Sequence, residues 1–208
     1  MSDFTNHLDL IDRRTGVAGE ARTITLSRTY DAEIEDVWEA LTDPERLKRW
    51  FLPVSGDFRV GGKYQIEGNA GGEILVCEAP TLLKITWVMG VPAESDINEV
   101  SVRLSTKGDE ETHLELEHAA TVDPNMWGQF GPGAVGVGWD LTLLGLGLHF
   151  QGQSVGDPNA WQSTPEARAF MTRSSTLWGG AHLAAGADAA EVEAAVHNTT
   201  QFYAPDPA

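Results

Sequence analysis

The longest apolar pattern in the chain runs from Pro132 to Gly152. At 3.6 residues per turn, this stretch predicts a helix with two apolar stripes. The first stripe consists of Val135, Trp139, Leu143, Leu146 and Phe150, and the second of Val137, Leu141, Leu144 and Leu148. Because such a helix is apolar almost all round, we expect other elements to cover it on both sides.

Glycines and polar residues inside this stretch indicate what surrounds it. Within the helix it carries Gly136, Gly138, Gly145 and Gly147. Each disfavours a helix by roughly 0.5–1 kcal/mol relative to alanine, so we expect a compensating close approach to a sheet or to another helix. Asp140 and His149 keep every uncharged apolar run shorter than about 18 residues, which argues against a membrane span.

Upstream of this helix, apolar and polar residues alternate in seven short segments that predict β-strands. The strands are expected at residues 22–30, 56–60, 63–67, 73–78, 82–89, 97–105 and 112–119. Between the first two strands, apolar positions at helical spacing predict two short helices, the second running from Pro44 to Trp50. Strands with one apolar and one polar face are typical of an antiparallel sheet with one wet face. The long helix would cover the apolar face.

The remaining segments complete a prediction of three regions. Residues 1–21 are polar and are expected to form an N-terminal arm, and residues 22–152 to form the sheet-and-helix domain. In residues 153–208, helices are predicted after Thr164 and after Asp188, each a suitable N-cap residue. We expect this helical extension to cover the second stripe of the long helix, either within one chain or across a homodimer formed through both segments.

Charge and motif content exclude several classes of function. The formal net charge of -17 argues against nucleic acid or an anionic membrane as a partner, since both attract basic surfaces. The single cysteine, Cys77, excludes an internal disulfide. The N-terminus lacks the apolar segment of a signal peptide, so a cytoplasmic location is expected. Zinc-binding histidine pairs, a phosphate-binding loop and a dinucleotide fingerprint are absent from the sequence, so we expect neither a metal nor a cofactor.

Several short motifs resemble those of the helix-grip proteins, the START/Bet v allergen or SRPBCC superfamily. They are Asp36–Leu47 followed by Trp50, Phe58–Gly62, the strand containing Pro80, Leu82 and Trp87, Thr112–His118, and Gly138-Trp139. Within the superfamily, the chain is similar to the branch related to the heat-shock-protein-90 ATPase activator. The resemblance covers about residues 22–152. It implies an α+β helix-grip fold, in which a curved seven-stranded antiparallel sheet wraps around a long C-terminal helix.

A curved sheet wrapped on a helix tends to enclose a cavity, which is where we expect ligand binding. Strand phase and the inner stripe of the helix suggest nine residues for this site: Tyr64, Ile66, Trp87, Met89, Val102, Leu116, His118, Trp139 and Leu143. The resemblance adds Trp50 and Phe51, which lie where the mouth of the family's cavity is usually found. The alternative is that these side chains simply fill the core. His118 is the one titratable residue in the inward phase, so it is either a general base or a core histidine bonded to its surroundings. Asp140 would then be its partner or, as we favour, a surface acid.

Three hypotheses for the function follow. The leading one is a binding protein for a small hydrophobic molecule, based on the inward aromatic residues and the missing catalytic set. The second is an enzyme of the cyclase or dehydratase kind found among helix-grip relatives, with His118 as acid and base. The third is a co-chaperone that activates an ATPase, which the resemblance alone suggests.

Overall fold

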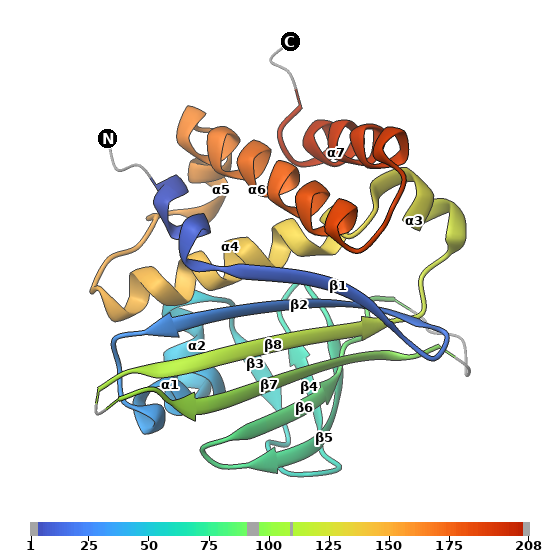
Figure 1. Ribbon diagram of the computed structural model, residues 1–208. Helices are drawn as coiled ribbons and strands as arrows, with labels where there is room; N and C mark the ends of the chain where they lie inside the picture. The colour runs from blue at the N-terminus through green and yellow to red at the C-terminus, as the bar shows by residue number, and fades with distance from the viewer. Residues whose placement is uncertain (1–3, 91–95, 109, 206–208) are drawn as a thin grey trace.

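An eight-stranded antiparallel sheet forms one layer of this α+β protein, as the computed structural model shows for residues 4–90, 96–108 and 110–205 (Figure 1). The strand order is β1-β2-β8-β7-β6-β5-β4-β3. The strands are β1 (Asp12–Ala18), β2 (Ala21–Tyr30), β3 (Val54–Gly56), β4 (Lys63–Ile66), β5 (Gly71–Glu78), β6 (Leu82–Thr86), β7 (Asn98–Thr106) and β8 (Thr112–Ala120). The helix-grip fold predicted from the sequence is confirmed.

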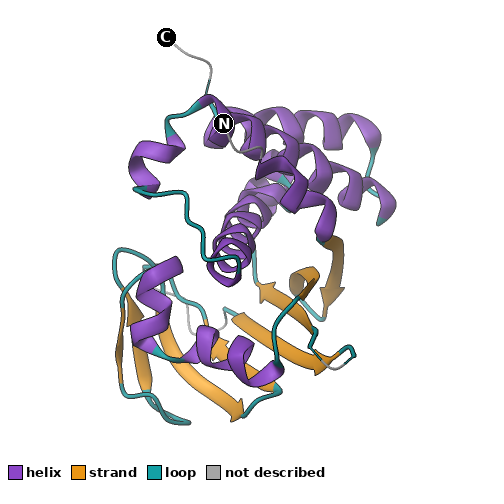
Figure 2. Cartoon of the chain, turned by 90° about the vertical axis from the view of Figure 1, so that its left-hand side faces the viewer, coloured by secondary structure: helices purple, strands orange, loops and turns teal. Residues whose placement is uncertain are grey.

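Helices lie on one side of the curved sheet (Figures 1 and 2). They are the 3-10 helix η1 (Phe4–Leu10), α1 (Ile34–Thr42), α2 (Pro44–Trp50), α3 (Pro124–Phe130), α4 (Gly133–Phe150), α5 (Pro158–Gln162), α6 (Pro165–Ala184) and α7 (Ala189–Tyr203). Helix α4 lies nearest to the sheet, with α6 and α7 beyond α4. Figure 2 looks nearly along α4 and shows the sheet curving around it, with α1 and α2 on the same side of the sheet.

Strand β1 corrects the predicted strand count from seven to eight. Residues 12–18, predicted to be part of an arm, pair with β2 along their whole length, from Asp12 opposite Ser27 to Ala18 opposite Ala21. Their side chains carry no apolar alternation, because β1 lies at the edge of the sheet and is held mainly by backbone pairing. A smaller correction concerns β3, which spans Val54–Gly56 instead of residues 56–60.

Helix α4 is covered on both sides, as its two apolar stripes predict. Trp139, Leu143 and Leu146 face the sheet, where they contact the same pocket as residues of β4 to β8. Asp140 and Gly136 face α6. By length and composition alone α4 could cross a membrane, but 56% of it is buried inside the protein, as in the core helix of a folded domain. The cover over the second stripe comes from the same chain, so the predicted homodimer is not needed to bury it.

Two glycines of α4 allow the close approach that the sequence predicted. A methyl group at Gly136 would overlap the indole ring of Trp178 in α6, which is fully buried. On another face of the helix, a methyl group at Gly147 would come within 2.6 Å of the guanidinium of Arg28 in β2. Both positions therefore place large side chains directly against the helix backbone.

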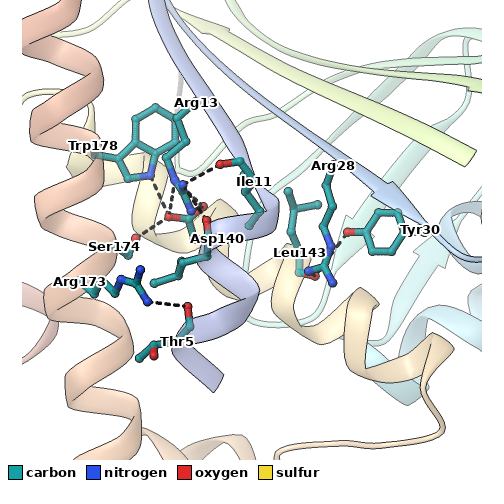
Figure 3. A network of polar contacts seen from close by, with 11 residues as sticks. Thr5, Ile11, Arg13, Arg28, Tyr30, Asp140, Leu143, Arg173, Ser174 and Trp178 are labelled. Atoms are coloured by element: carbon teal, nitrogen blue, oxygen red, sulfur yellow. Dashed lines mark hydrogen bonds and ion pairs between the residues drawn. The ribbon is translucent and has the colours of Figure 1, made fainter. Parts of the chain in front are cut away.

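Asp140 corrects a second expectation, because it is completely buried rather than a surface acid or a partner of His118 (Figure 3). Its carboxylate accepts hydrogen bonds from Arg13 of β1 at 2.9 Å, from the Ser174 hydroxyl at 2.5 Å and from the Trp178 indole at 3.1 Å. Burial raises the pKa of the Asp140 carboxyl, and Arg13 together with the other two donors opposes that shift. The network connects β1, α4 and α6.

Candidate functional site

A pocket of about 200 Å³ lies between the sheet and the helices α1, α2 and α4. Tyr64 and Ile66 of β4 alternate with exposed neighbours and so point into it, as do Val102 of β7 and Leu116 of β8. Trp139, Leu143 and Leu146 close it from the side of α4. The pocket therefore occupies the space between curved sheet and long helix where the sequence placed it.

Helix α2 forms part of the wall of the pocket through Leu47 and Trp50. The Asp43 side chain accepts hydrogen bonds from the backbone N–H groups of Glu45 and Arg46 and so begins this helix. Trp50 then turns its ring into the pocket, and its indole N–H donates to the carbonyl of Ala40 at 3.0 Å. The helix backbone of α4 at Gly145 leaves room for the Trp50 carbonyl.

The hydroxyl groups in the lining are hydrogen-bonded within the protein. The Tyr64 hydroxyl donates to the carbonyl of Thr86 at 2.6 Å, and the Thr42 and Thr142 hydroxyls donate to carbonyls one helical turn earlier, at 2.7 and 2.9 Å. Burial raises the pKa of Tyr64 above its ordinary value, which keeps the phenol neutral. Among the described residues that line the pocket, none carries a carboxylate, ammonium or guanidinium group. This lining favours an uncharged, apolar occupant.

His118 lies beside the pocket, but the structure does not place it in the lining. Its Nε2 is 2.7 Å from the Asn98 Oδ1 atom, and its Nδ1 accepts a hydrogen bond from the Trp139 indole N–H at 3.1 Å. Burial lowers the pKa of His118 to about 4, so the imidazole is neutral near pH 7. Since both ring nitrogens are already engaged, the geometry does not support His118 as a general base.

Nine of the eleven predicted site residues line the pocket. They are Trp50, Phe51, Tyr64, Ile66, Trp87, Val102, Leu116, Trp139 and Leu143. The two exceptions are His118 and Met89, which is 69% exposed. The alternation that turns Leu83, Ile85 and Trp87 inward continues past the end of β6 only as far as the backbone pairing of Val88 with Gly71, so it stops before Met89.

Other lining residues lie outside the sequence prediction of the site. Leu41, Thr42 and Leu47 come from α1 and α2, and Phe58 and Cys77 lie where the pocket reaches the surface. The helical spacing of Leu41 with Val37 and Trp38 identified an apolar helix face but not the cavity that it borders. The sequence analysis also did not identify Asn98, which contacts His118 without lining the pocket. Asn98 shares the inward strand phase of Val100 and Val102.

Metal binding receives no support from the side chains that the structure describes. Within residues 4–90, 96–108 and 110–205, no group of three or more histidine, cysteine, aspartate or glutamate residues is placed to hold a metal ion.

Comparison with solved structures identifies a similar protein, CalU16 from Micromonospora echinospora. Its crystal structure is 35% identical over 82% of this chain and 97% of that chain, with a TM-score of 0.63. Its solution structure is 38% identical over 85% of this chain and 94% of that chain, with a TM-score of 0.64. Residues 1–148 make up only about 71% of this chain, so the alignment reaches into the C-terminal helices.

More distant structures share the fold. A conserved protein of unknown function from Enterococcus faecalis is 15% identical over 86% of this chain and 95% of that chain, with a TM-score of 0.57. The Aha1 dimer from Colwellia psychrerythraea is 20% identical over 60% of this chain and 92% of that chain, with a TM-score of 0.50.

The family comparison agrees with these structures. No protein of curated function matches the chain. Residues 31–148, more than half of the chain, match the family described as "Activator of Hsp90 ATPase homolog 1-like protein". Together with the helix-grip architecture and the similarity to CalU16, this match establishes that the chain belongs to that family.

Proposed function

We propose that this protein binds a small, uncharged and mainly apolar molecule in the pocket between the sheet and α4. The observation that carries the proposal is the composition of the lining, in which apolar side chains predominate and the hydroxyl and indole groups named above are hydrogen-bonded within the protein. A ligand with a buried charge would find no partner there, and the cost of burying an unpaired charge is high.

The dimensions of the pocket limit the size of the ligand. Its volume of about 200 Å³ lies just below the roughly 300–1,000 Å³ typical of sites for drug-sized ligands. Three tryptophans, Trp50, Trp87 and Trp139, form part of the walls, and aromatic rings favour stacked or edge-on contacts with other rings. A compact aromatic molecule therefore fits the proposal better than a long acyl chain.

Tryptophan fluorescence tests the proposal directly, because three of the seven tryptophans line the pocket. Titration with the neutral probe N-phenyl-1-naphthylamine is expected to quench this fluorescence and to raise the probe's own emission. Val102→Phe adds bulk inside the pocket and is expected to weaken binding about tenfold or more, by removing space that the probe needs. The matched control is Val17→Phe, at an exposed position of β1, which should leave binding unchanged.

Two outcomes would contradict the proposal. The first is a wild-type protein that binds neither this probe nor any member of a panel of small neutral aromatic compounds. The second is a probe that binds Val102→Phe as tightly as the wild-type chain, because the bound probe would then lie elsewhere on the protein.

Two further predictions from the sequence compare less well with the geometry. An enzymatic role loses its proposed base, since His118 is buried with both nitrogens hydrogen-bonded. An ATPase-activating role is carried by the family description alone, and stimulation of a purified Hsp90 ATPase by this chain would favour it over ligand binding.

The cytoplasmic location and the homodimer remain predictions. The Aha1 dimer from Colwellia psychrerythraea motivates the second, at the level of a shared fold. Since α6 of the same chain packs on α4 at Gly136 and Asp140, that side of the long helix is not free to contact a second copy.

A further inference from the structure

Asn98, at the start of β7, is connected to both tryptophans at one end of the pocket. Its backbone carbonyl accepts a hydrogen bond from the backbone N–H of Trp87 at 2.8 Å. Its side-chain oxygen lies 2.7 Å from Nε2 of His118, and Nδ1 of His118 accepts from the Trp139 indole N–H at 3.1 Å. Asn98 thus anchors the backbone of Trp87 and is connected to the indole of Trp139 through His118.

This chain of hydrogen bonds leaves His118 a single arrangement. The Asn98 oxygen is an acceptor, so the proton lies on Nε2, and Nδ1 must then be the acceptor for the indole of Trp139. His118 is only 5% exposed, and its inward neighbours Ile24, Trp87 and Trp139 carry no charge that could compete for either nitrogen. The imidazole therefore has the donor and acceptor pattern that holds the indole in one orientation.

The two tryptophans form one wall. Their ring centroids are 4.9 Å apart with the planes tilted by 51°, and both rings line the pocket. The imidazole of His118 contacts the two rings edge-on, with centroids 6.4 Å from Trp87 and 5.8 Å from Trp139. Rotation of either indole would break this contact and extend the pocket along the sheet.

Exposed apolar residues lie close in sequence to the residues that form this wall. Met89 follows Trp87 by two residues, Ile97 precedes Asn98, and Val135 lies one helical turn before Trp139. All three are exposed, at 69%, 39% and 41%. The two rings therefore bound the pocket on this side, and their position decides how far a ligand can extend.

We infer that Asn98 and His118 are positioning residues that hold Trp87 and Trp139 as the end wall of the pocket and thereby limit the length of the ligand. This inference rests on the proposed function for its statement about ligands. The positioning itself is independent of ligand binding and can be tested without one.

The test combines two disruptive variants with one rescue. His118→Leu removes the acceptor for the indole N–H, and Asn98→Ala removes the acceptor for His118; His118→Gln keeps one donor and one acceptor. The Trp139 indole signal in ¹H–¹⁵N spectra is identified as the one missing from Trp139→Phe. In both disruptive variants we expect this N–H to exchange with solvent about five- to tenfold faster, as for the loss of one hydrogen bond. His118→Gln should restore most of the protection.

Ligand length is measured with naphthalene and the longer N-phenyl-1-naphthylamine. In His118→Leu and Asn98→Ala, the ratio of the two dissociation constants should shift by about five- to tenfold toward the longer probe, as expected when the hydrogen bond that fixes the wall is lost. The control is Leu104→Ala, which weakens the core on the same face of β7 without touching the pocket or the hydrogen-bonded chain. This variant should lower stability and leave both the ratio and the indole exchange unchanged.

Each result supports or overturns a defined part of the inference. Unchanged indole exchange in both disruptive variants, or equal acceleration in Leu104→Ala, overturns the positioning role. Faster exchange with an unchanged probe ratio overturns the limit on ligand length. If the wild-type protein binds neither probe, the proposed function fails and the limit on length fails with it, while the exchange measurement still decides the positioning role.

Discussion

His118 shows how a residue that resembles a catalytic group becomes a structural one through its neighbours. Its position in the inward strand phase is the same for both roles. What separates the roles is that Asn98 and Trp139 occupy its two nitrogens, and that burial lowers its pKa to about 4. A histidine in this state stabilises the fold only while it is neutral.

Acidification should therefore weaken the protein through His118. The unfolded chain binds a proton at its ordinary pKa of 6.5, and the folded protein only at about 4, so the unfolded state holds more protons in this interval. Stability is complete above pH 6.5 and is lost as the pH falls toward 4. Between pH 7 and 4, the free energy of unfolding should decrease by about 3 kcal/mol more in the wild-type chain than in His118→Gln.

Denaturant titrations at a series of pH values provide the measurement. The other histidines are common to both chains, so their contribution cancels in the difference. Parallel pH profiles for the two chains would show that His118 titrates normally in the folded state and would disprove this prediction.

At the scale of elements, α4 accounts for the arrangement of the whole structure. The helix contacts the sheet through Trp139, Leu143 and Leu146 and contacts α6 through the opposite stripe. Its glycines have different roles, because only some of them lie under a large side chain. Gly136 lies against the Trp178 ring, whereas a methyl group at Gly138 would meet only the Tyr203 hydroxyl at 3.6 Å, an ordinary contact distance.

Alanine substitutions at these two glycines should therefore have opposite signs. Gly136→Ala forces the buried Trp178 ring out of its position, and we expect a loss of about 2–3 kcal/mol, typical of overpacking in a core. Gly138→Ala should stabilise the protein by about 0.5–1 kcal/mol, the difference in helix propensity. Thermal and urea denaturation of both variants measure these changes. A similar loss of stability in both variants would show that the glycine at position 136 is not required for close packing against Trp178.

At the scale of the whole molecule, the three layers are joined by a buried polar network. Arg13 of β1 and Ser174 and Trp178 of α6 meet at Asp140 of α4, so both ends of the chain contribute to one buried carboxylate (Figure 3). Removing one partner of a buried ion pair destabilises a folded protein by about 3–5 kcal/mol, because the remaining charge stays in the interior. The extension after residue 152 is therefore joined to the sheet domain by hydrogen bonds to a buried carboxylate as well as by apolar contact.

Removal of the extension tests whether residues 22–152 form an independent unit. A chain of residues 1–152 would expose Val137, Leu144 and Leu148, which are fully buried, and would leave Asp140 without two of its donors. We expect this truncated chain to aggregate or to lose cooperative unfolding, as seen by size-exclusion chromatography and near-UV circular dichroism. A chain of residues 1–205 is the control and should behave as the full chain. A monomeric, cooperatively unfolding 1–152 fragment would instead establish the extension as a separate domain.

The local pattern of apolar and polar residues was enough to predict most elements and the faces that they bury. Alternation along the strands and the two stripes of α4 predicted the antiparallel sheet, the position of the helix and seven of the residues that line the pocket, and the family resemblance added Trp50 and Phe51. These features are predictable because local periodicity records which face of a strand or helix is apolar. The same periodicity predicted that a second cover must lie over α4.

Only the tertiary structure decided which residues meet. Residues 12–18 form a strand because β2 offers them backbone partners, and Asp140 is buried because Arg13, 127 positions away in the chain, neutralises it. Between the two roles that the sequence left open for His118, its hydrogen bonds with Asn98 and Trp139 favour the core histidine, and Met89 lies outside the pocket because backbone pairing stops at Val88. Each of these outcomes depends on a partner that is distant in the sequence or on where pairing stops, and neither leaves a periodic signal in the chain.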